Sequence, residues 1–210
     1  MIGTPGVGKT RLALEIIHNI RKEREEAYFC DLTEAKTDLG VDLFVAKAMN
    51  VRLRNQDPIG QLGEHFAEHK TILVLDNLEQ VVQPVGEVIQ RWMTQSDSLK
   101  IIATSRIRLQ IPEEKSFPIQ PLSILEAMEL FAKRGQQADS SFQLTKENRD
   151  VVGRLSQQLD KLPLAIELAA ARLNIFNVEE IERRLKERFS LLRSRKKGTQ
   201  TLHAALDWSW

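Results

Sequence analysis

The 210-residue sequence contains little cysteine, few aromatic residues and almost no net charge. Its single cysteine, Cys30, cannot form a disulfide within the chain, so a fold stabilised by internal disulfides is excluded. Cys30 falls in the apolar stretch 27–30, where a buried thiol is commonplace. A reducing cytoplasm is therefore the expected setting.

Charge and hydropathy argue against two classes of partner. Thirty basic and 29 acidic side chains leave a formal net charge of +1, so no overall field favours nucleic acid or an anionic membrane. No apolar run approaches the roughly 18 residues of a membrane span. We expect no direct nucleic-acid binding by this segment and no membrane insertion. The 42% of apolar residues suffices for one α/β domain and a smaller attachment.

The most specific feature is a glycine-rich segment that fits the P-loop pattern GxxxxGK[ST] at every fixed position. An amphipathic helix is expected to follow it. Its glycines would let backbone N–H groups surround a phosphate, Lys9 would meet the β- and γ-phosphates, and the Thr10 hydroxyl would ligate Mg²⁺. The alternative is a chance glycine-rich turn. The residues expected to bind nucleotide here are Gly3, Thr4, Pro5, Gly6, Val7, Gly8, Lys9, Thr10 and Arg11.

A second segment indicates a metal-binding carboxylate. Residues 71–75 form a continuous apolar run that ends in Asp76, as in a buried parallel strand of the Walker B type. Ligands of open α/β sheets lie at the carboxyl ends of the strands, so Asp76 is expected beside Thr10, where both would hold Mg²⁺. The alternative is an aspartate that caps a turn.

A third strand is predicted at 100–105, and it is followed by Arg106. A guanidinium at this edge of the sheet could sense or neutralise a terminal phosphate. A solvated surface arginine is the alternative, because no spacing rule ties Arg106 to the phosphate.

The beginning of the sequence is unusual for a P-loop protein. A buried strand of about five residues normally precedes the loop, but only Met1 and Ile2 precede Gly3. Either translation starts upstream, or the chain is a fragment whose sheet lacks most of an interior strand. The second case would leave neighbouring strands unpaired and would lower stability.

The remaining pattern predicts a P-loop α/β domain with a three-layer parallel sheet, followed by helices only. Capping boxes are expected at Ser123 with Glu126 and at Asn177 with Glu180, and Pro163 is expected at a helix start. Thr145 is expected to cap the helix that carries Val152, Leu155 and Leu159. The α/β part is predicted to comprise helices at 11–26, 42–49, 58–69 and 85–94, and strands at 27–30, 71–76, 100–105 and 116–119.

Nearly the whole chain resembles the nucleotide-binding module of bacterial STAND regulators, which are relatives of NB-ARC and AAA+ ATPases. Seven blocks carry the resemblance in order: GTPGVGKTRLALEI, ILVLDNLEQV, IIATSR, PLSILEAMELF, LPLAIELAAARL, RRLKERFSLL and TLHAALDWSW. The resemblance implies an NTPase core at 1–120, a helical lid domain at 121–192, and a linker with the first helix of a truncated winged-helix domain at 193–210. It also implies a role in transcriptional regulation, with sensor and output domains or self-association in the full-length protein.

The resemblance assigns roles that spacing does not show. Pro163, in LPLA, becomes a candidate contact for the adenine, and Arg106 matches the family's arginine after the third core strand. His203 does not match the family's more distal phosphate-contacting histidine.

One departure concerns catalysis. Many P-loop ATPases place a second acid after the Walker B aspartate, but Asn77 stands here and cannot accept a proton. Glu79 is a candidate for positioning water, or it solvates a helix start. The hypothesis is an ATP/ADP switch with slow Mg-dependent hydrolysis, in which Lys9, Asp76, Glu79 and Arg106 are the catalytic candidates. The alternatives are a non-hydrolysing ADP-binding scaffold, an inactive gene fragment, and a small-molecule or nucleotide kinase.

Other features are weaker. His65 and His69 lie four residues apart, as two zinc ligands would, but no third ligand is evident. A basic loop at 193–197 could touch phosphate, although a solvated linker is favoured. Trp208 and Trp210 fit a missing core better than a stacking surface.

Overall fold

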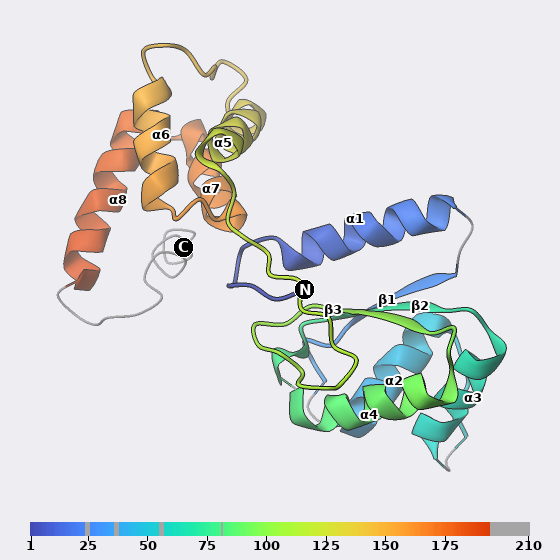
Figure 1. Cartoon of the computed structure of the whole chain (residues 1–210). Helices are drawn as coiled ribbons and strands as arrows, with labels where there is room; N and C mark the ends of the chain where they lie inside the picture. Colours follow the sequence, from blue (N-terminus) through green and yellow to red (C-terminus); the bar gives the residue numbers. More distant parts are fainter. Residues whose placement is uncertain (24–25, 36–37, 55–56, 81, 194–210) are drawn as a thin grey trace. The chain divides into compact units, whose positions relative to one another are not determined.

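The computed structural model describes residues 1–23, 26–35, 38–54, 57–80 and 82–193 (Figure 1). The chain divides into two compact units, which are described separately below. The first unit contains residues 1–4 and 9–119, and the second contains residues 5–8 and those from Gln120 onward. The predictions for residues 194–210, including the winged-helix segment, the two C-terminal tryptophans and His203, lie outside the described residues.

The first unit alternates helices and strands, as the sequence predicts. Its elements are α1 (Lys9–Lys22), β1 (Ala27–Asp31), α2 (Asp38–Met49), α3 (Pro58–Glu68), β2 (Ile72–Asp76), the short 3₁₀ helix η1 (Leu78–Gln80), α4 (Val82–Gln95) and β3 (Lys100–Ala103). Helix α1 ends four residues before the predicted Glu26. The Glu23 N–H donates to the Ile20 carbonyl at 3.0 Å, which tightens the last turn and ends the helix.

The three strands form a parallel sheet in the order β1-β2-β3. Asp31 is paired in register with Asp76, and Leu75 with Ala103, so the strands end at one edge. Parallel strands of this kind are covered by helices on both faces. The predicted parallel α/β architecture is confirmed.

Residues 1–3 extend this sheet beyond β3. Ile2 forms parallel bridges with both Ser105 and Pro118, and its N–H donates to the Phe117 carbonyl at 2.9 Å. The Ile119 N–H donates to the Ile2 carbonyl at 2.7 Å. The expectation that the neighbouring strands would be left unpaired is therefore wrong at these positions. The predicted strand at 116–119 is only an isolated bridge, in which Pro118 is paired with Ile2.

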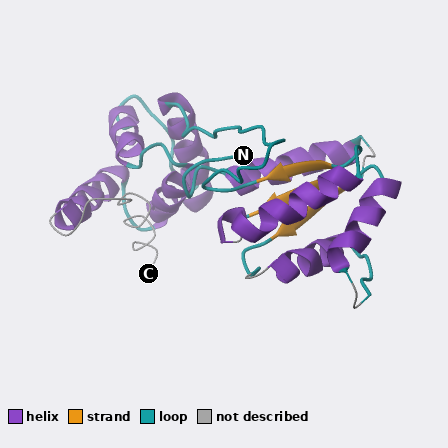
Figure 2. Cartoon of the chain, turned by 60° about the horizontal axis from the view of Figure 1, so that its bottom comes forward, coloured by secondary structure: helices purple, strands orange, loops and turns teal. Residues whose placement is uncertain are grey.

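The sheet lies between two helical layers (Figures 1 and 2). Leu73 and Leu75 of β2 pack in a core with α2, α3 and α4, whereas Ile72 and Val74 pack with α1. Alternate residues of a strand point to opposite faces, so a strand covered on both sides is apolar throughout. Trp92, the largest fully buried side chain among the described residues, donates its Nε1–H to the Ile59 carbonyl at 3.0 Å.

The second unit contains helices only within its described residues: α5 (Ile124–Ala138), α6 (Arg149–Gln158), α7 (Pro163–Ala170), the 3₁₀ helix η2 (Ala171–Asn174) and α8 (Val178–Arg193). The capping box of Ser123 and Glu126 is confirmed, with Glu126 accepting from the Ser123 N–H at 2.7 Å. Pro163 is the first residue of α7, as predicted.

Two further capping predictions have different outcomes, since the one at Thr145 fails and the side-chain cap from Asn177 is present. The predicted cap at Thr145 is wrong, because α6 begins at Arg149. Asn148 Oδ1 accepts from the Thr145 N–H at 2.9 Å and its amide donates to the Gln143 carbonyl, which holds a turn in front of the helix. At α8, Asn177 accepts from the Glu180 N–H at 2.9 Å. The Glu180 carboxylate binds Arg183 and Arg184, which lie further along the helix.

The apolar faces of these helices build the core of the second unit. Its fully buried side chains include Ala127, Phe131, Val152, Leu155, Leu159 and Ile181. The side chains of Phe189 and Leu192, which the sequence places on the same face of α8, lie outside the described residues. Within the part of the chain that the structure describes, no helix combines the length and the apolar character needed to cross a membrane.

Candidate functional site

The glycine-rich loop turns through two glycines with positive φ before α1 begins. Gly6 has φ of 77° and Gly8 has φ of 99°, both in a region that side chains with a Cβ rarely adopt. Helix α1 then starts at Lys9. The free N–H groups of the first helical turn and the positive end of its dipole lie at this position, which suits an anion.

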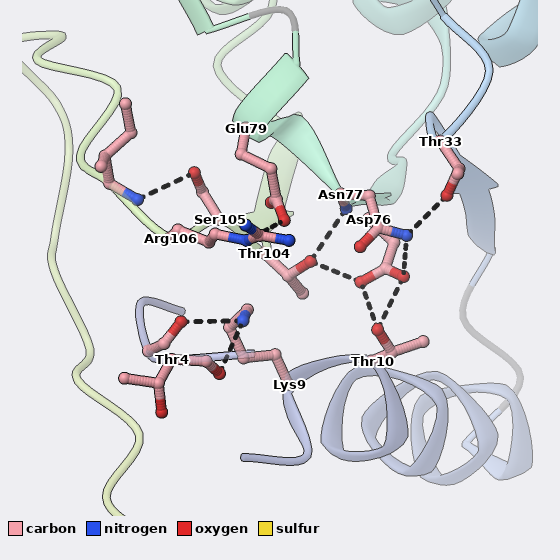
Figure 3. Close-up of polar contacts among 12 residues, drawn as sticks. Thr4, Lys9, Thr10, Thr33, Asp76, Asn77, Glu79, Thr104, Ser105 and Arg106 are labelled. Carbon is pink, nitrogen blue, oxygen red and sulfur yellow. Dashed lines mark hydrogen bonds and ion pairs between the residues drawn. The ribbon is translucent and has the colours of Figure 1, made fainter. Parts of the chain in front are cut away.

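Lys9 folds back over the start of its own loop. Its Nζ donates to the Gly3 carbonyl at 2.8 Å and to the Thr4 carbonyl at 3.2 Å (Figure 3). Only 8% of the residue is exposed. Burial is the main cause that lowers the pKa of the Lys9 ammonium, and Arg106 lowers it further, whereas Glu79 and Asp76 raise it. A buried cation in this setting gains from an anionic partner.

Thr10 and Asp76 meet at the edge of the sheet. The Thr10 hydroxyl lies 2.8 Å from Asp76 Oδ2 and 3.1 Å from Oδ1, and Asp76 is 1% exposed (Figure 3). Buried Thr104, which follows β3, also donates its hydroxyl to Asp76 Oδ1. Hydroxyl and carboxylate oxygens are the ligands that Mg²⁺ prefers, so the donor set fits this ion.

Asn77 directs its side chain toward the end of β1. Its Nδ2 lies 3.2 Å from Asp31 Oδ1, 2.8 Å from Thr33 Oγ1 and 3.1 Å from Asp76 Oδ2. Its backbone has φ of 65°, a left-handed conformation that asparagine tolerates better than most residues. One amide group thus connects the ends of β1 and β2. The hydrogen bond from the Thr33 hydroxyl is the main cause that lowers the pKa of Asp31.

Glu79 and Arg106 form an ion pair on the other side of Asp76. Arg106 Nε lies 2.9 Å from Glu79 Oε1, with the two side chains 58% and 17% exposed, respectively (Figure 3). Glu79 Oε2 is buried and has no hydrogen-bond partner among the described residues. The two residues that the sequence nominates separately are therefore partners.

The tip of the glycine-rich loop, residues 5–8, belongs to the second unit together with α7. The Leu164 N–H donates to the Gly6 carbonyl at 3.2 Å. A Cβ placed on Gly8 would lie 4.0 Å from Pro163 Cγ, so Pro163 adjoins the loop. Val7 is buried, whereas the Arg11 side chain is exposed on α1.

The two histidines considered as zinc ligands stack on each other. The rings of His65 and His69 lie 4.4 Å apart, and His69 Nδ1 is 3.0 Å from the His65 carbonyl oxygen. Among the residues described by the structure, no group of three or more His, Cys, Asp or Glu side chains is placed to hold a metal ion.

The sequence alone did not identify Asp31, Thr33 and Thr104 as part of the site. The available signal was their position: each lies at or just after the end of an apolar run that is predicted to be a strand. Which strands are neighbours decides whether such residues meet, and a single sequence does not show that order.

Comparison with known proteins identifies relatives by sequence and a shared fold by structure. No protein-family model matches it. Over 217 residues it is 34% identical to proteins of Mycobacterium tuberculosis and Mycobacterium bovis that are provisionally named HTH-type transcriptional regulators. The match covers all of this chain and 24% of those proteins. An uncharacterized protein of Mycobacterium tuberculosis is 30% identical, and the match covers 55% of its length.

Solved structures show the fold. The ORC2 protein of Aeropyrum pernix, determined in ADPNP and ADP complexes, has a TM-score of 0.59 at 13% identity, with 89% of this chain and 60% of ORC2 covered. A STAND protein with a tetratricopeptide-repeat sensor from Pyrococcus horikoshii has a TM-score of 0.55 at 17% identity, with 89% of this chain and 29% of that protein covered. The chain has the α/β fold of AAA+ P-loop ATPases.

Proposed function

We propose that this chain is an ATP/ADP-binding switch module with slow Mg-dependent hydrolysis, in a signal-responsive transcriptional regulator. The observation that carries the proposal is the meeting of Thr10 with buried Asp76 beside the start of α1, with Lys9 Nζ over the same loop. Mycobacterial relatives named as regulators, and the fold shared with a protein that binds ADPNP and ADP, support it.

Each candidate site residue has a proposed task. Lys9 would exchange its two carbonyl partners for phosphate oxygens, and the first N–H groups of α1 would donate to the same anion. Thr10 and Asp76 would hold Mg²⁺, which would neutralise phosphate charge when bound. Arg106 would contact the terminal phosphate, and Pro163, which adjoins Gly8, is the proposed contact for the base.

The domain boundaries and the role of the module in the full-length protein are also part of the proposal. We propose an NTPase core at 1–120, a helical lid at 121–192 and a linker with a winged-helix start at 193–210. Sensor and output domains, or self-association, would convert the nucleotide state into a signal, and the setting would be the cytoplasm. Slow turnover suits a switch, because both nucleotide states must persist long enough to be recognised.

The first test is binding of a fluorescent ADP analogue to the purified chain, with and without Mg²⁺. We expect micromolar binding that Lys9→Ala abolishes, and a Mg²⁺ dependence that Asp76→Asn removes. Circular-dichroism melts of all three proteins establish that each is folded. A cooperatively melting wild type that binds no nucleotide would overturn the proposal.

A second measurement separates the switch from a non-hydrolysing scaffold that holds ADP structurally. Steady release of inorganic phosphate from ATP, lost in Lys9→Ala, would support the hydrolytic switch. Tight ADP binding without phosphate release would favour the scaffold. A wild type without a cooperative melt would favour the inactive fragment.

A further inference from the structure

The carboxyl edge of the sheet presents a second aspartate next to Asp76. Asp31 ends β1 and is paired in register with Asp76, which ends β2. In a parallel sheet, residues in register at the strand ends lie at the same edge. Asp76 is 1% exposed, whereas Asp31 is exposed, so the second carboxylate is accessible to water.

Asn77 joins these two carboxylates through a single amide nitrogen. Nδ2 is 3.2 Å from Asp31 Oδ1 and 3.1 Å from Asp76 Oδ2, and Thr33 Oγ1 accepts from it at 2.8 Å. Figure 3 shows the Asn77 amide between Asp76 and Thr33. Asn77 stands where many P-loop ATPases carry an acid, and here it holds the acid of the neighbouring strand.

The Asp31 carboxylate is fixed through one of its oxygens. Oδ1 accepts from the Thr33 N–H at 2.9 Å, from the Thr33 hydroxyl at 2.6 Å and from Asn77 Nδ2. Three donors on one carboxylate oxygen favour the ionised form and fix the orientation of the group. A fixed, charged, accessible carboxylate is suited to accept a hydrogen bond from water.

Glu79, the other candidate acid, already forms an ion pair with Arg106. Its Oε1 accepts from Arg106 Nε at 2.9 Å, and its Oε2 is buried. One oxygen of Glu79 is thus occupied by a guanidinium and the other is closed off from solvent, so Glu79 is less suited than Asp31 to orient a water molecule. The hydrogen bonds that Asp31 accepts from the described residues come from neutral groups, the N–H and hydroxyl of Thr33 and the amide of Asn77.

We infer that Asp31 orients the water molecule that attacks the terminal phosphate, and that Asn77 positions Asp31 beside Asp76. This inference rests on the proposed hydrolysis. The water oxygen forms a bond to the terminal phosphorus, and the bond from phosphorus to the bridging oxygen breaks with its electron pair on the ADP β-phosphate. The water proton passes to an oxygen of the phosphate product, so Asp31 accepts a hydrogen bond and keeps its charge.

The matched variants are Asp31→Asn and Asp97→Asn. Both remove one negative charge, but exposed Asp97 precedes β3 and therefore lies at the opposite edge of the parallel sheet. The amide oxygen in Asp31→Asn can still accept from Thr33 and Asn77, so the turn is expected to persist. Melting temperatures of both variants check this expectation.

The experiment measures three properties of the full chain: affinity for a fluorescent ADP analogue with Mg²⁺, trapping of ADP with aluminium fluoride, and single-turnover hydrolysis of ATP. Aluminium fluoride with ADP mimics the transferring phosphoryl group and requires an in-line water. We expect Asp31→Asn to keep its ADP affinity within about twofold, to lose trapping, and to hydrolyse at least about tenfold more slowly. Asp97→Asn should match the wild type in all three.

The outcomes separate this inference from the function on which it rests. If the wild type hydrolyses ATP and Asp31→Asn does so at the same rate, the role of Asp31 is wrong and the switch stands. If Glu79→Gln loses trapping while Asp31→Asn keeps it, Glu79 orients the water instead. If the wild type binds ADP but neither traps it nor releases phosphate, both the hydrolysis and the role of Asp31 are overturned, and nucleotide binding remains.

Discussion

Arg106 Nε lies 2.9 Å from Glu79 Oε1, so one ion pair contains both groups that the sequence nominated for separate roles at the phosphate. The pair joins the segment after β3 to η1, which follows β2. An arginine that binds a terminal phosphate must give up this carboxylate or share it. Glu79 therefore competes with the phosphate for the guanidinium in the proposed switch.

The first prediction concerns this competition. Glu79→Gln should bind a non-hydrolysable ATP analogue about two- to fivefold more tightly, the equivalent of the ~0.5–1 kcal/mol of a partly exposed ion pair. Its ADP affinity should not change. Calorimetric titration of both nucleotides measures the difference. In an Arg106→Gln background the gain should vanish, and a gain that persists there would contradict the competition.

The second prediction concerns the positive φ of Gly8. Gly8→Ala forces a Cβ into φ of 99° and should destabilise the protein by about 1–2 kcal/mol while abolishing nucleotide binding. The matched control is Gly153→Ala in α6, where a Cβ would make an ordinary 3.6 Å contact with Met128 Sδ. That change should stabilise by about 0.5–1 kcal/mol. Denaturant unfolding measures both, and effects of equal sign would contradict the argument.

Local signals predicted the order of helices and strands well, and they failed where distant residues decide. The buried strand in the run 71–75 and the capping box of Ser123 with Glu126 could both be predicted. A continuous apolar run and a reciprocal cap are each visible in residues that are neighbours in the sequence. The pairing of Ile2 with Ser105 and Pro118 joins residues over a hundred positions apart. No periodicity in the sequence encodes such a pairing.

The residues of the candidate site also fall into those that the sequence predicts and those that only the structure identifies. The glycine-rich pattern gave Lys9 and Thr10 by type and spacing, and the sheet rule placed Asp76 beside them. Asp31 could be identified only from the structure, because the register of β1 against β2 is what brings it next to Asp76. The hydrogen bonds of Asn77 also depend on its left-handed backbone, which the sequence does not reveal.

The third prediction concerns Thr104, which holds the Asp76 carboxylate in place. Its buried hydroxyl donates to Asp76 Oδ1 and accepts from the Asn77 N–H at 3.1 Å. Thr104→Val keeps the shape but leaves both groups without this partner, which should cost about 1–3 kcal/mol. It should also weaken the Mg²⁺ dependence of nucleotide binding. Thr104→Ser keeps the hydroxyl and should stay close to the wild type in both measurements, so equal losses in the two variants would point to packing instead.

The last prediction concerns the acid sensitivity of the second unit. Glu182 of α8 is 7% exposed and accepts from Arg154 of α6 at 2.9 Å, while Lys186 Nζ lies 2.8 Å from the same oxygen. The hydrogen bond from Arg154 is the main cause that lowers the pKa of Glu182, and burial opposes it. A carboxyl whose folded pKa is depressed contributes stability above its unfolded pKa of about 4.3, and this contribution is lost as the pH falls through the folded pKa.

The melting temperature of the wild type should therefore fall more steeply below pH ~4.5 than that of Glu182→Gln, because the variant has no carboxyl to protonate. At pH 7 the variant should melt at a lower temperature, since Arg154 and Lys186 then lose their anionic partner. Exposed Glu129 of α5 provides the control, and Glu129→Gln should follow the wild-type pH profile. A Glu182→Gln profile parallel to the wild type between pH 3 and pH 7 would show that the Arg154 pair does not couple protonation to folding.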